Sequence, residues 1–305
     1  MEGAGRRGRP EEYPCMISRL WTRSEPAEFL PLAPIVQGPP SLTAPVSQAC
    51  TASQFDEPAY RYWCEQIAEY PRFHRKQWEF CYILQALARN GMLAPGMRGL
   101  GFGVGGEPLA ALMASRGVSV MATDLAPDRA AKLGWVATSQ HAANRDALNE
   151  RNLCDPDRFT SLVEFRFMDM NSIDSDLSGN FDFCWSACAL EHLGSIKKGL
   201  QFIKNSIDCL RPGGVAVHTT ELNCSSNEAT LDNTSTVLFR RSDFEALGRE
   251  LSAAGHELIF NFDLGDQPLD SHVDMPPYSA DQHLKLQIEQ WITTSFGIVI
   301  HKGFV

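Results

Sequence analysis

The sequence predicts an α/β fold in which helices cover both faces of a mostly parallel sheet. Short apolar runs at residues 98–104, 119–125, 165–170, 181–186 and 215–220 alternate with helical patterns, and this alternation favours parallel strands joined by helices. A glycine-rich stretch separates the first of these strands from the first following helix. Such a stretch lets the backbone approach a ligand closely.

The composition is that of an ordinary globular protein. The 305 residues suit one large α/β domain with extensions. The net charge of −10 argues against nucleic acid or an anionic membrane surface as a partner. No apolar run approaches the roughly 18 residues of a membrane span, and residues 1–14 do not resemble a signal peptide. The nine cysteines form no C-x-x-C pair, which indicates buried thiols, and we expect a cytoplasmic protein. The sequence leaves the oligomeric state open, a homo-oligomer included.

Three regions follow one another along the chain. Residues 1–54 are rich in proline and glycine and predict an irregular arm. Residues 55–93 predict a helical cap of two helices, which ends at an Asn-Gly pair. Residues 94–305 form the expected cofactor-binding domain, with a polar insertion at 265–294. Within this insertion, the spacing of Leu284, Ile288 and Trp291 predicts a short helix.

The glycine-rich stretch reads G-F-G-V-G-G at residues 101–106. Pro108 follows in the first turn of a helix expected at 109–116, where proline is favoured. The strand at 119–125 carries Asp124, whose carboxylate can bind both hydroxyls of a ribose. The pattern matches the dinucleotide-binding fingerprint. A nucleoside-containing cofactor is therefore expected, and an NAD(P)-dependent oxidoreductase is one interpretation.

Later motifs favour a different cofactor. The strand at 181–186 leads into A-L-E-H at residues 189–192. Apolar residues spaced by four and three then mark an amphipathic helix from Ile196, which ends in L-R-P-G-G at residues 210–214. A helix at 242–254 and strands at 256–264 and 297–302 complete the pattern.

With these motifs, the chain resembles class I S-adenosylmethionine-dependent methyltransferases over about residues 93–302. The resemblance implies a Rossmann-like, seven-stranded sheet with an antiparallel last strand, and S-adenosyl-L-methionine as the cofactor. Many members carry an acid where this chain has Gly99, and Glu107 or a backbone carbonyl is the expected substitute. The resemblance and the strand ends together give these cofactor-binding residues: Gly101, Phe102, Gly103, Gly105, Glu107, Asp124, Leu125, Asp169, Met170 and Ser186.

Methyl transfer from a sulfonium needs alignment and exclusion of water. A hydroxyl acceptor also needs a base. The candidates lie at the ends of the fourth and fifth strands: His192, which we favour, Glu191 and His218. Glu191 and His192 could instead only contact the cofactor, and His218 could be a buried, hydrogen-bonded residue. His218 and Glu221 could also hold a metal, but their spacing is not diagnostic, so we predict no metal.

The polar insertion and the last strand ends supply the expected acceptor site. Its candidate residues are Glu221, Arg240, His272, Asp274 and Tyr278. Trp135 could form a wall of the cofactor pocket or belong to the core. The predicted function is methyl transfer to a small or medium polar acceptor, with an oxygen of a sugar, glycolipid or secondary metabolite as the favoured target. The alternatives are the oxidoreductase and a non-catalytic binding protein with a degenerate methyltransferase fold.

Overall fold

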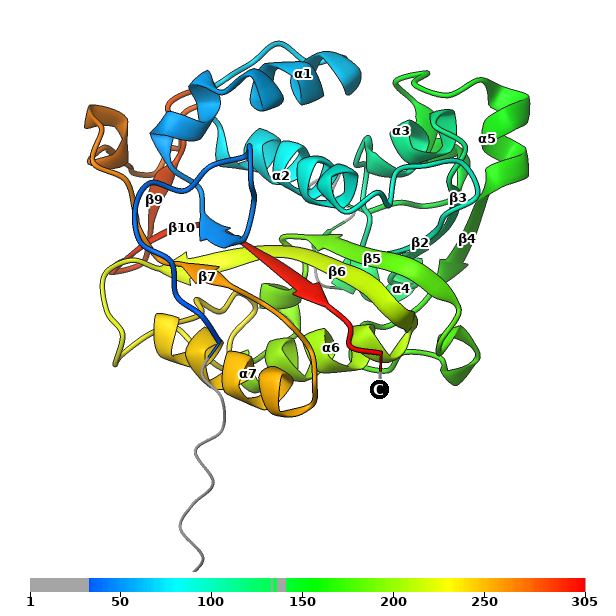
Figure 1. Cartoon of the computed structure of the whole chain (residues 1–305). Helices are drawn as coiled ribbons and strands as arrows, with labels where there is room; N and C mark the ends of the chain where they lie inside the picture. The colour runs from blue at the N-terminus through cyan, green and yellow to red at the C-terminus, as the bar shows by residue number, and fades with distance from the viewer. Residues whose placement is uncertain (1–32, 133, 136–140, 305) are drawn as a thin grey trace, which may run out of the picture.

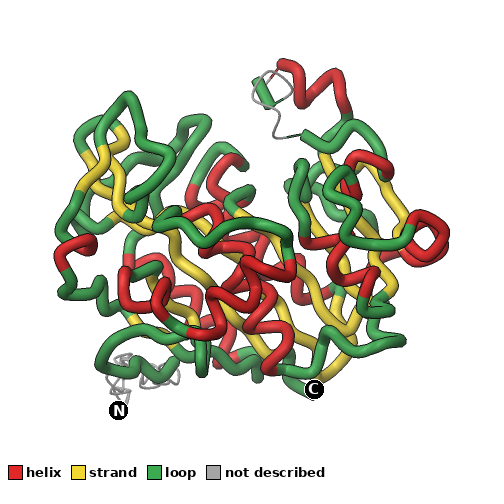
Figure 2. Tube along the Cα trace, turned by 90° about the horizontal axis from the view of Figure 1, so that it is seen from above, coloured by secondary structure: helices red, strands yellow, loops and turns green. Residues whose placement is uncertain are grey.

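The computed structural model describes residues 33–132, 134–135 and 141–304. Figure 1 shows a central twisted sheet, with α1, α2, α3 and α5 over one face and α6 and α7 under the other. Seen from above, the helices of the first layer cross over the strands (Figure 2). This arrangement confirms the predicted α/β fold. Among the described residues, no helix is long and apolar enough to cross a membrane.

The sheet has ten strands, eight of which follow the order β4-β3-β2-β5-β6-β10-β1-β7. The strands are β1 (Ser47–Ala49), β2 (Arg98–Phe102), β3 (Ser119–Asp124), β4 (Val163–Phe167), β5 (Phe181–Ala187), β6 (Leu210–Asn223), β7 (Phe260–Asn261), β8 (Val273–Asp274), β9 (Lys285–Ile288) and β10 (Trp291–His301). The α-helices are α1 (Pro58–Gln66), α2 (Arg75–Arg89), α3 (Leu109–Ser115), α4 (Pro127–Lys132), α5 (Pro156–Leu162), α6 (Ile196–Asp208) and α7 (Arg241–Ala253).

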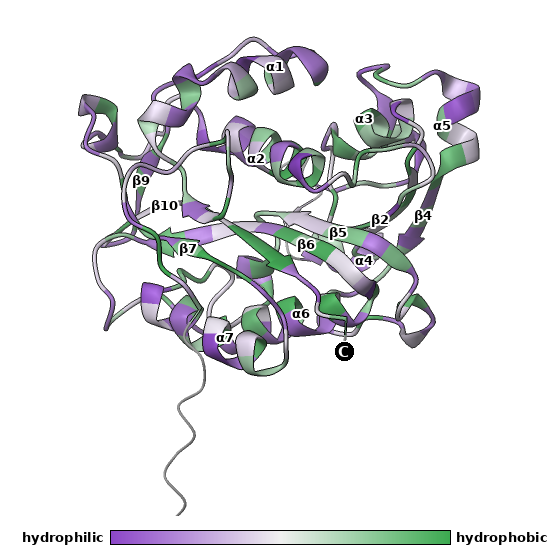
Figure 3. Ribbon diagram, in the orientation of Figure 1, coloured by the Kyte–Doolittle hydropathy of each residue, from purple (hydrophilic) through white to green (hydrophobic). Residues whose placement is uncertain are grey.

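Strands β2 to β6 form the parallel half of the sheet. Figure 3 shows hydrophobic residues gathered along the central strands and a hydrophilic edge at β4. Helix α6 begins where the Ser195 hydroxyl accepts a hydrogen bond from the Lys198 amide, at 3.2 Å. It buries Phe202, Ile203 and Ile207 against the sheet, as its apolar spacing predicts.

The far end of the sheet is antiparallel, as expected, because β10 pairs antiparallel with β6. The helix expected around residues 284–291 is wrong: β9 pairs antiparallel with β10, from Ile288 opposite Trp291. Leu284, Leu286 and Ile288 also satisfy the two-residue period of a strand. A short apolar run such as this one fits the period of a helix as well as that of a strand. Pairing with β10 makes the segment a strand.

The N-terminal arm is not irregular throughout. Its residues 1–32 lie outside the described residues, but Ser47–Ala49 form β1 inside the sheet. Gln48 lies opposite Gly297 of β10, with antiparallel strands, and opposite Asn261 of β7, with parallel strands. The Ser47 hydroxyl accepts a hydrogen bond from the Val299 amide at 3.0 Å. The arm therefore supplies a fully buried strand, which its proline content conceals.

Helix α2 belongs to the core and does not merely cap the domain. Its Trp78, Tyr82 and Ile83 side chains are fully buried. A Cβ on Gly297 would lie 2.1 Å from the Tyr82 ring, so only glycine lets this ring lie against β10. The position of α2 against the sheet brings the start of the helix to the ends of β5 and β6.

Candidate functional site

A cavity of about 650 Å³ opens at the carboxyl ends of β2, β3, β5 and β6. Its walls come from the glycine-rich loop, the ends of these strands, the start of α2 and the insertion around Tyr278. Open α/β sheets bind ligands at this edge. A second, shallower hollow of about 730 Å³ lies along the outer edge of β4 and contains none of the predicted site residues.

The glycine-rich loop forms one wall of the cavity. Gly103 and Gly105 have φ values of +58° and +51°, a left-handed conformation that glycine adopts without strain. A Cβ on Gly103 would lie 3.1 Å from the Ala189 Cβ and 3.2 Å from the Met170 sulfur. Glycine at this position therefore allows the loop to pack closely against two other walls of the cavity.

Asp124 ties this loop to the end of β3. One carboxylate oxygen accepts hydrogen bonds from the Gly105 amide at 3.1 Å and the Ala142 amide at 2.8 Å. The other accepts from the Leu125 amide at 2.7 Å. Burial raises the pKa of Asp124, and the three amide donors oppose this shift. The carboxylate thus lies at the cavity wall with a fixed orientation.

Asp169 and Met170 lie beside it, on the loop after β4, and both line the cavity. The Arg129 guanidinium donates to Asp169 at 2.6 Å, and the Asn171 amide donates at 2.9 Å. Burial would raise the pKa of Asp169, but these two donors hold it below its usual range. Asp169 is therefore a fixed anion at the rim of the cavity.

Gly99 stands at the position where many similar sequences carry an acidic residue, and Glu107 is the expected substitute. A Cβ on Gly99 would lie 2.3 Å from the Phe183 ring, so no acidic side chain fits there. Glu107 lines the cavity and is only 8% exposed. One of its carboxylate oxygens has no hydrogen-bond partner among the described residues, and the other lies 3.9 Å from the Lys76 ammonium. Burial raises the pKa of Glu107 well above its usual range. A buried carboxylate with a free oxygen is suited to a cationic ligand group.

Three predicted cofactor residues do not line the cavity. Gly101 lies under the Trp185 ring, which a Cβ would approach to 2.5 Å. Phe102 is buried against Phe202, with ring centroids 5.0 Å apart. The Ser186 hydroxyl lies 2.9 Å from a ring nitrogen of His218. These residues pack inside the domain next to the cavity and do not contact it: Gly101 faces the core that contains Trp185, and Phe102 faces the core beneath the sheet.

His218 is likewise not at the cavity, so its assignment as a catalytic candidate is wrong. Its ring is fully buried, and its nitrogens lie 2.9 Å from the Ser186 hydroxyl and 3.0 Å from the Ser206 hydroxyl. Burial lowers the pKa of His218 to about 3. His218 and Glu221 lie three residues apart on β6 and so face opposite sides of the sheet. They cannot share a metal ion.

His192 and Glu191 both line the cavity. The Nδ1 atom of His192 lies 2.9 Å from the Ser235 carbonyl oxygen, which can only accept a hydrogen bond. Nδ1 therefore carries the proton, and Nε2 remains a proton acceptor. Nε2 lies 3.9 Å from the Glu191 carboxylate, and the Trp135 ring packs on the imidazole with centroids 4.4 Å apart. Trp135 also lines the cavity, which favours the pocket-wall interpretation.

Glu191 is almost completely buried. It is 1% exposed, and one carboxylate oxygen accepts a hydrogen bond from the Thr220 hydroxyl at 3.1 Å. The other oxygen has no hydrogen-bond partner in the described part of the chain. Burial raises the pKa of Glu191, and the neighbouring His192 opposes this shift.

The start of α2 contributes charged residues that the sequence analysis missed. Arg75 forms an ion pair with Glu221, and the Lys76 ammonium lies 3.2 Å from Glu79. Burial would raise the pKa of Glu79, but Lys76 and Arg75 hold it below its usual range. The sequence contained a signal for these residues, because two cations and an acid lie in the first turns of a helix whose other residues are mostly buried.

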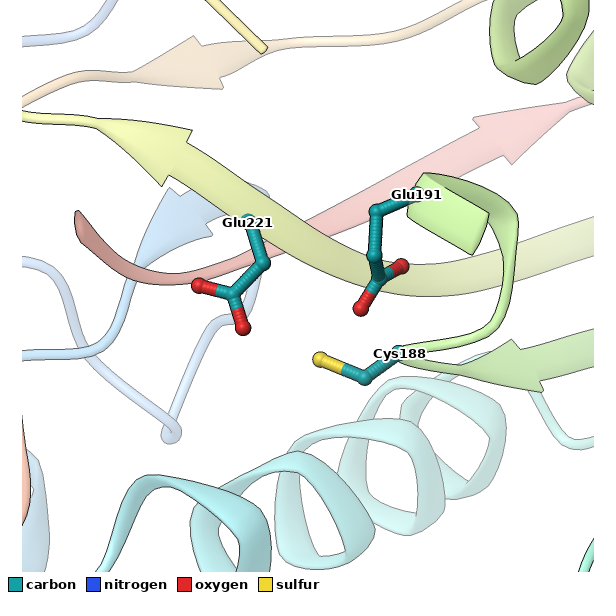
Figure 4. Close-up of side chains that lie close together, drawn as sticks. All are labelled: Cys188, Glu191 and Glu221. Atoms are coloured by element: carbon teal, nitrogen blue, oxygen red, sulfur yellow. The ribbon is translucent and has the colours of Figure 1, made fainter. Parts of the chain in front are cut away.

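Cys188 completes this end of the cavity. Figure 4 shows its thiol beside the carboxylates of Glu191 and Glu221. Cys188 has a φ of +46°, an uncommon conformation for a residue other than glycine. Its thiol donates a hydrogen bond to Glu79 at 2.9 Å, and burial raises its pKa well above the usual range.

The predicted acceptor residues divide into two groups. Glu221 and Tyr278 line the cavity. Arg240 instead pairs with Asp243 at 2.8 Å, Asp274 accepts a hydrogen bond from His283 at 2.6 Å, and His272 is exposed. None of these three lines the cavity. The apolar side chains of Phe80, Leu286 and Ile288 line it instead.

Comparison with known proteins identifies the class to which this fold and cavity belong. A family model described as a methyltransferase domain matches residues 73–262, which is more than half of the chain. The chain therefore belongs to the methyltransferase domain family. This result confirms the predicted S-adenosylmethionine-dependent family and its cofactor, and favours it over the oxidoreductase. No curated protein matches the sequence significantly.

Solved structures with a similar fold are distant in sequence. An S-adenosylmethionine-dependent methyltransferase from Methanosarcina mazei is 14% identical, with a TM-score of 0.44 over 72% of this chain and 98% of that one. Magnesium protoporphyrin IX methyltransferase from Synechocystis PCC 6803, with bound S-adenosylhomocysteine, is 11% identical, with a TM-score of 0.42 over 82% and 97%. Phosphoethanolamine N-methyltransferase 2 from Haemonchus contortus is 21% identical, with a TM-score of 0.40 over 63% of this chain and only 40% of that one. The family assignment rests on the domain match.

Proposed function

We propose that this chain transfers a methyl group from S-adenosylmethionine to a hydroxyl oxygen of a small or medium polar acceptor, such as a sugar, a glycolipid or a secondary metabolite. The observation that carries this proposal is the fixed tautomer of His192. Its Nδ1 proton is held by the Ser235 carbonyl, at 2.9 Å, in a residue that lines the cavity. Nε2 is then available as a base, which a hydroxyl acceptor needs.

The cavity residues suit the parts of the cofactor. Asp124 would hold the ribose hydroxyls, and Met170 would lie against the adenine. The free oxygen of Glu107 would receive the cationic amino group of the methionyl end, in place of the acid that Gly99 excludes. The bound cofactor supplies a methyl group already activated on a sulfonium.

In this proposal, the protein's own contribution is proton transfer in a dry site. His192 Nε2 takes the proton of the acceptor hydroxyl as the new carbon–oxygen bond forms. The Glu191 carboxylate, 3.9 Å away, stabilises the resulting imidazolium. The Trp135 ring packs on the imidazole and keeps it oriented. Glu221 and Tyr278 would orient the acceptor at the other side of the cavity.

Calorimetric titration with S-adenosylhomocysteine, with NADH as the control, tests the cofactor. We expect micromolar binding of the first and none of the second. Binding of NADH alone would favour the oxidoreductase. Failure of both to bind folded protein would favour the non-catalytic alternative.

Transfer of a labelled methyl group to a panel of sugars and hydroxylated metabolites then tests the base. His192→Ala should lower turnover by about 10²–10⁴-fold, the usual effect of losing a general base. Its affinity for S-adenosylhomocysteine should remain close to that of the wild type. A parallel loss of cofactor affinity would make His192 a binding residue and refute its assignment as the base.

A further inference from the structure

Three potential metal ligands meet at the acceptor end of the cavity. Cys188 follows β5, Glu191 lies on the short 3₁₀ helix Leu190–His192, and Glu221 is near the end of β6. One ligand atom from each lies within 4.8 Å of the other two. Figure 4 shows the thiol and the two carboxylates side by side. The sequence does not reveal this set, because Glu221 lies 30 residues after Glu191 and only the pairing of β5 with β6 brings it beside the other two.

Glu191 supplies the observation that points to a ligand. Its side chain is 1% exposed, and no donor among the residues that the structure describes reaches one of its carboxylate oxygens. Thr220 fixes the other oxygen at 3.1 Å, so the carboxylate keeps its position. A buried anionic oxygen without a partner is costly, and a cation would satisfy it.

The nearby cations do not fulfil this role. Arg75 pairs with Glu221 and lies 3.7 Å from Glu79, and the Lys76 ammonium lies 3.2 Å from Glu79. The positive charges of Arg75 and Lys76 thus balance the negative charges of Glu221 and Glu79. Glu191 remains, because no arginine or lysine among the described residues forms an ion pair with its carboxylate.

We propose that Cys188, Glu191 and Glu221 bind one Zn²⁺ ion. A mixed sulfur and oxygen donor set suits Zn²⁺, whereas Mg²⁺ and Ca²⁺ favour oxygen ligands alone. Zinc bonds of about 2.0–2.3 Å place tetrahedral ligand atoms roughly 3.5 Å apart, so modest side-chain rotations would close the present spacing. The Cys188 thiol, which now donates to Glu79 at 2.9 Å, loses its proton to solvent on binding, because the thiolate is the form that ligates zinc.

Three protein ligands leave the fourth tetrahedral position open. Catalytic zinc sites have this arrangement, and the metal lowers the pKa of an oxygen bound there. The acceptor hydroxyl would occupy the open position, and this part of the inference rests on the proposed function. Zinc would then make the hydroxyl proton easier for His192 to remove. In the metal-bound site, Glu191 and Glu221 would act as zinc ligands, in place of their direct roles beside His192 and the acceptor.

Metal binding can be measured without an acceptor. The full-length protein, freed of metal by a chelator, is titrated with Zn²⁺ in competition with a fluorescent zinc chelator. We expect one Zn²⁺ per chain. Co²⁺ in place of Zn²⁺ should give the near-ultraviolet charge-transfer absorption of a thiolate ligand. Cys188→Ala should abolish this band and weaken Zn²⁺ binding at least tenfold, and the isosteric Glu191→Gln should also weaken binding.

Cys224→Ala is the matched control. Cys224 is also a partly buried thiol, at the end of β6, but it donates to the Leu222 carbonyl and lies outside the cluster. This variant should keep the Zn²⁺ affinity and the cobalt band. Absence of Zn²⁺ binding, or binding that Cys188→Ala leaves unchanged, would overturn the proposal. Zinc binding that depends on Cys188 in a protein that fails to bind S-adenosylhomocysteine would support the metal site and refute the proposed function.

Discussion

His218 should act as a pH-dependent element of stability. The Ser206 hydroxyl donates to the Ile203 carbonyl at 2.8 Å, so it must accept a hydrogen bond from His218 Nε2. Nδ1 is then the acceptor for the Ser186 hydroxyl. The neutral imidazole satisfies both partners, whereas a proton on Nδ1 would require Ser186 to turn its hydroxyl away. Burial without a compensating anion is why the pKa of His218 falls to about 3.

The size of the effect follows from linkage. In the unfolded chain, the imidazole returns to a pKa of about 6.5. Between that value and about 3, the unfolded state binds a proton that the folded state does not, so stability falls as the pH falls. The slope approaches 1.36 kcal/mol per pH unit. Between about pH 7.5 and pH 4.5, the imidazole therefore removes about 2.7 kcal/mol from the free energy of unfolding.

Urea denaturation of the wild type and His218→Asn, at both pH values, isolates this contribution from other titrating groups. Asparagine keeps an acceptor for Ser186 but does not titrate. The variant should be less stable at pH 7.5, by about 2–4 kcal/mol for the lost ring and hydrogen bond. The difference should shrink by about 2.7 kcal/mol at pH 4.5. A difference that does not change with pH would refute the reasoning. S-adenosylhomocysteine affinity should not change, because His218 lies outside the cavity.

Two further substitutions test the cofactor end of the cavity. Asp124→Ala should weaken S-adenosylhomocysteine binding by about 2–4 kcal/mol, since charge-assisted hydrogen bonds are lost; unchanged affinity by calorimetry in a folded variant would exclude the ribose assignment. Gly99→Asp, which introduces the acid common in this family, should destabilise the protein by more than about 3 kcal/mol in urea denaturation, because it drives a side chain into the Phe183 ring and buries a carboxylate. Wild-type stability of that variant, with tighter cofactor binding, would show that the ring moves aside and that Gly99 is not a steric requirement.

Local patterns predicted the part of the fold in which neighbours in sequence are also neighbours in space. The glycine-rich loop, the strand ending in Asp124 and the amphipathic α6 all follow from spacing and from residue preferences. Asp124 and Met170 could be placed at the cavity for the same reason, since Asp124 ends β3 and Met170 lies on the loop after β4. The two-residue period of a strand could also have excluded Ser186 and His218 before the structure was known.

Long-range pairing decided the elements that the sequence analysis misjudged. The Ser47–Ala49 segment has no strand pattern of its own and becomes one only between β10 and β7. The apolar spacing of the β9 segment also fits a helix, and pairing with β10 makes the segment a strand. Nothing in the local pattern of Arg75 and Lys76 predicts a site, because Glu221, the partner of Arg75, lies 146 residues later and reaches it only through the sheet.

The placement of β1 has a consequence for synthesis of the chain. Its partner β10 lies about 250 residues later, as the Ser47–Val299 hydrogen bond shows with a separation of 252 residues. At ribosomal speeds of about 5–20 residues per second, the N-terminal segment waits roughly 10–50 s for that strand to be made. Chaperones that bind short, extended segments would have time to engage residues 46–50, and synthesis of β10 would release them.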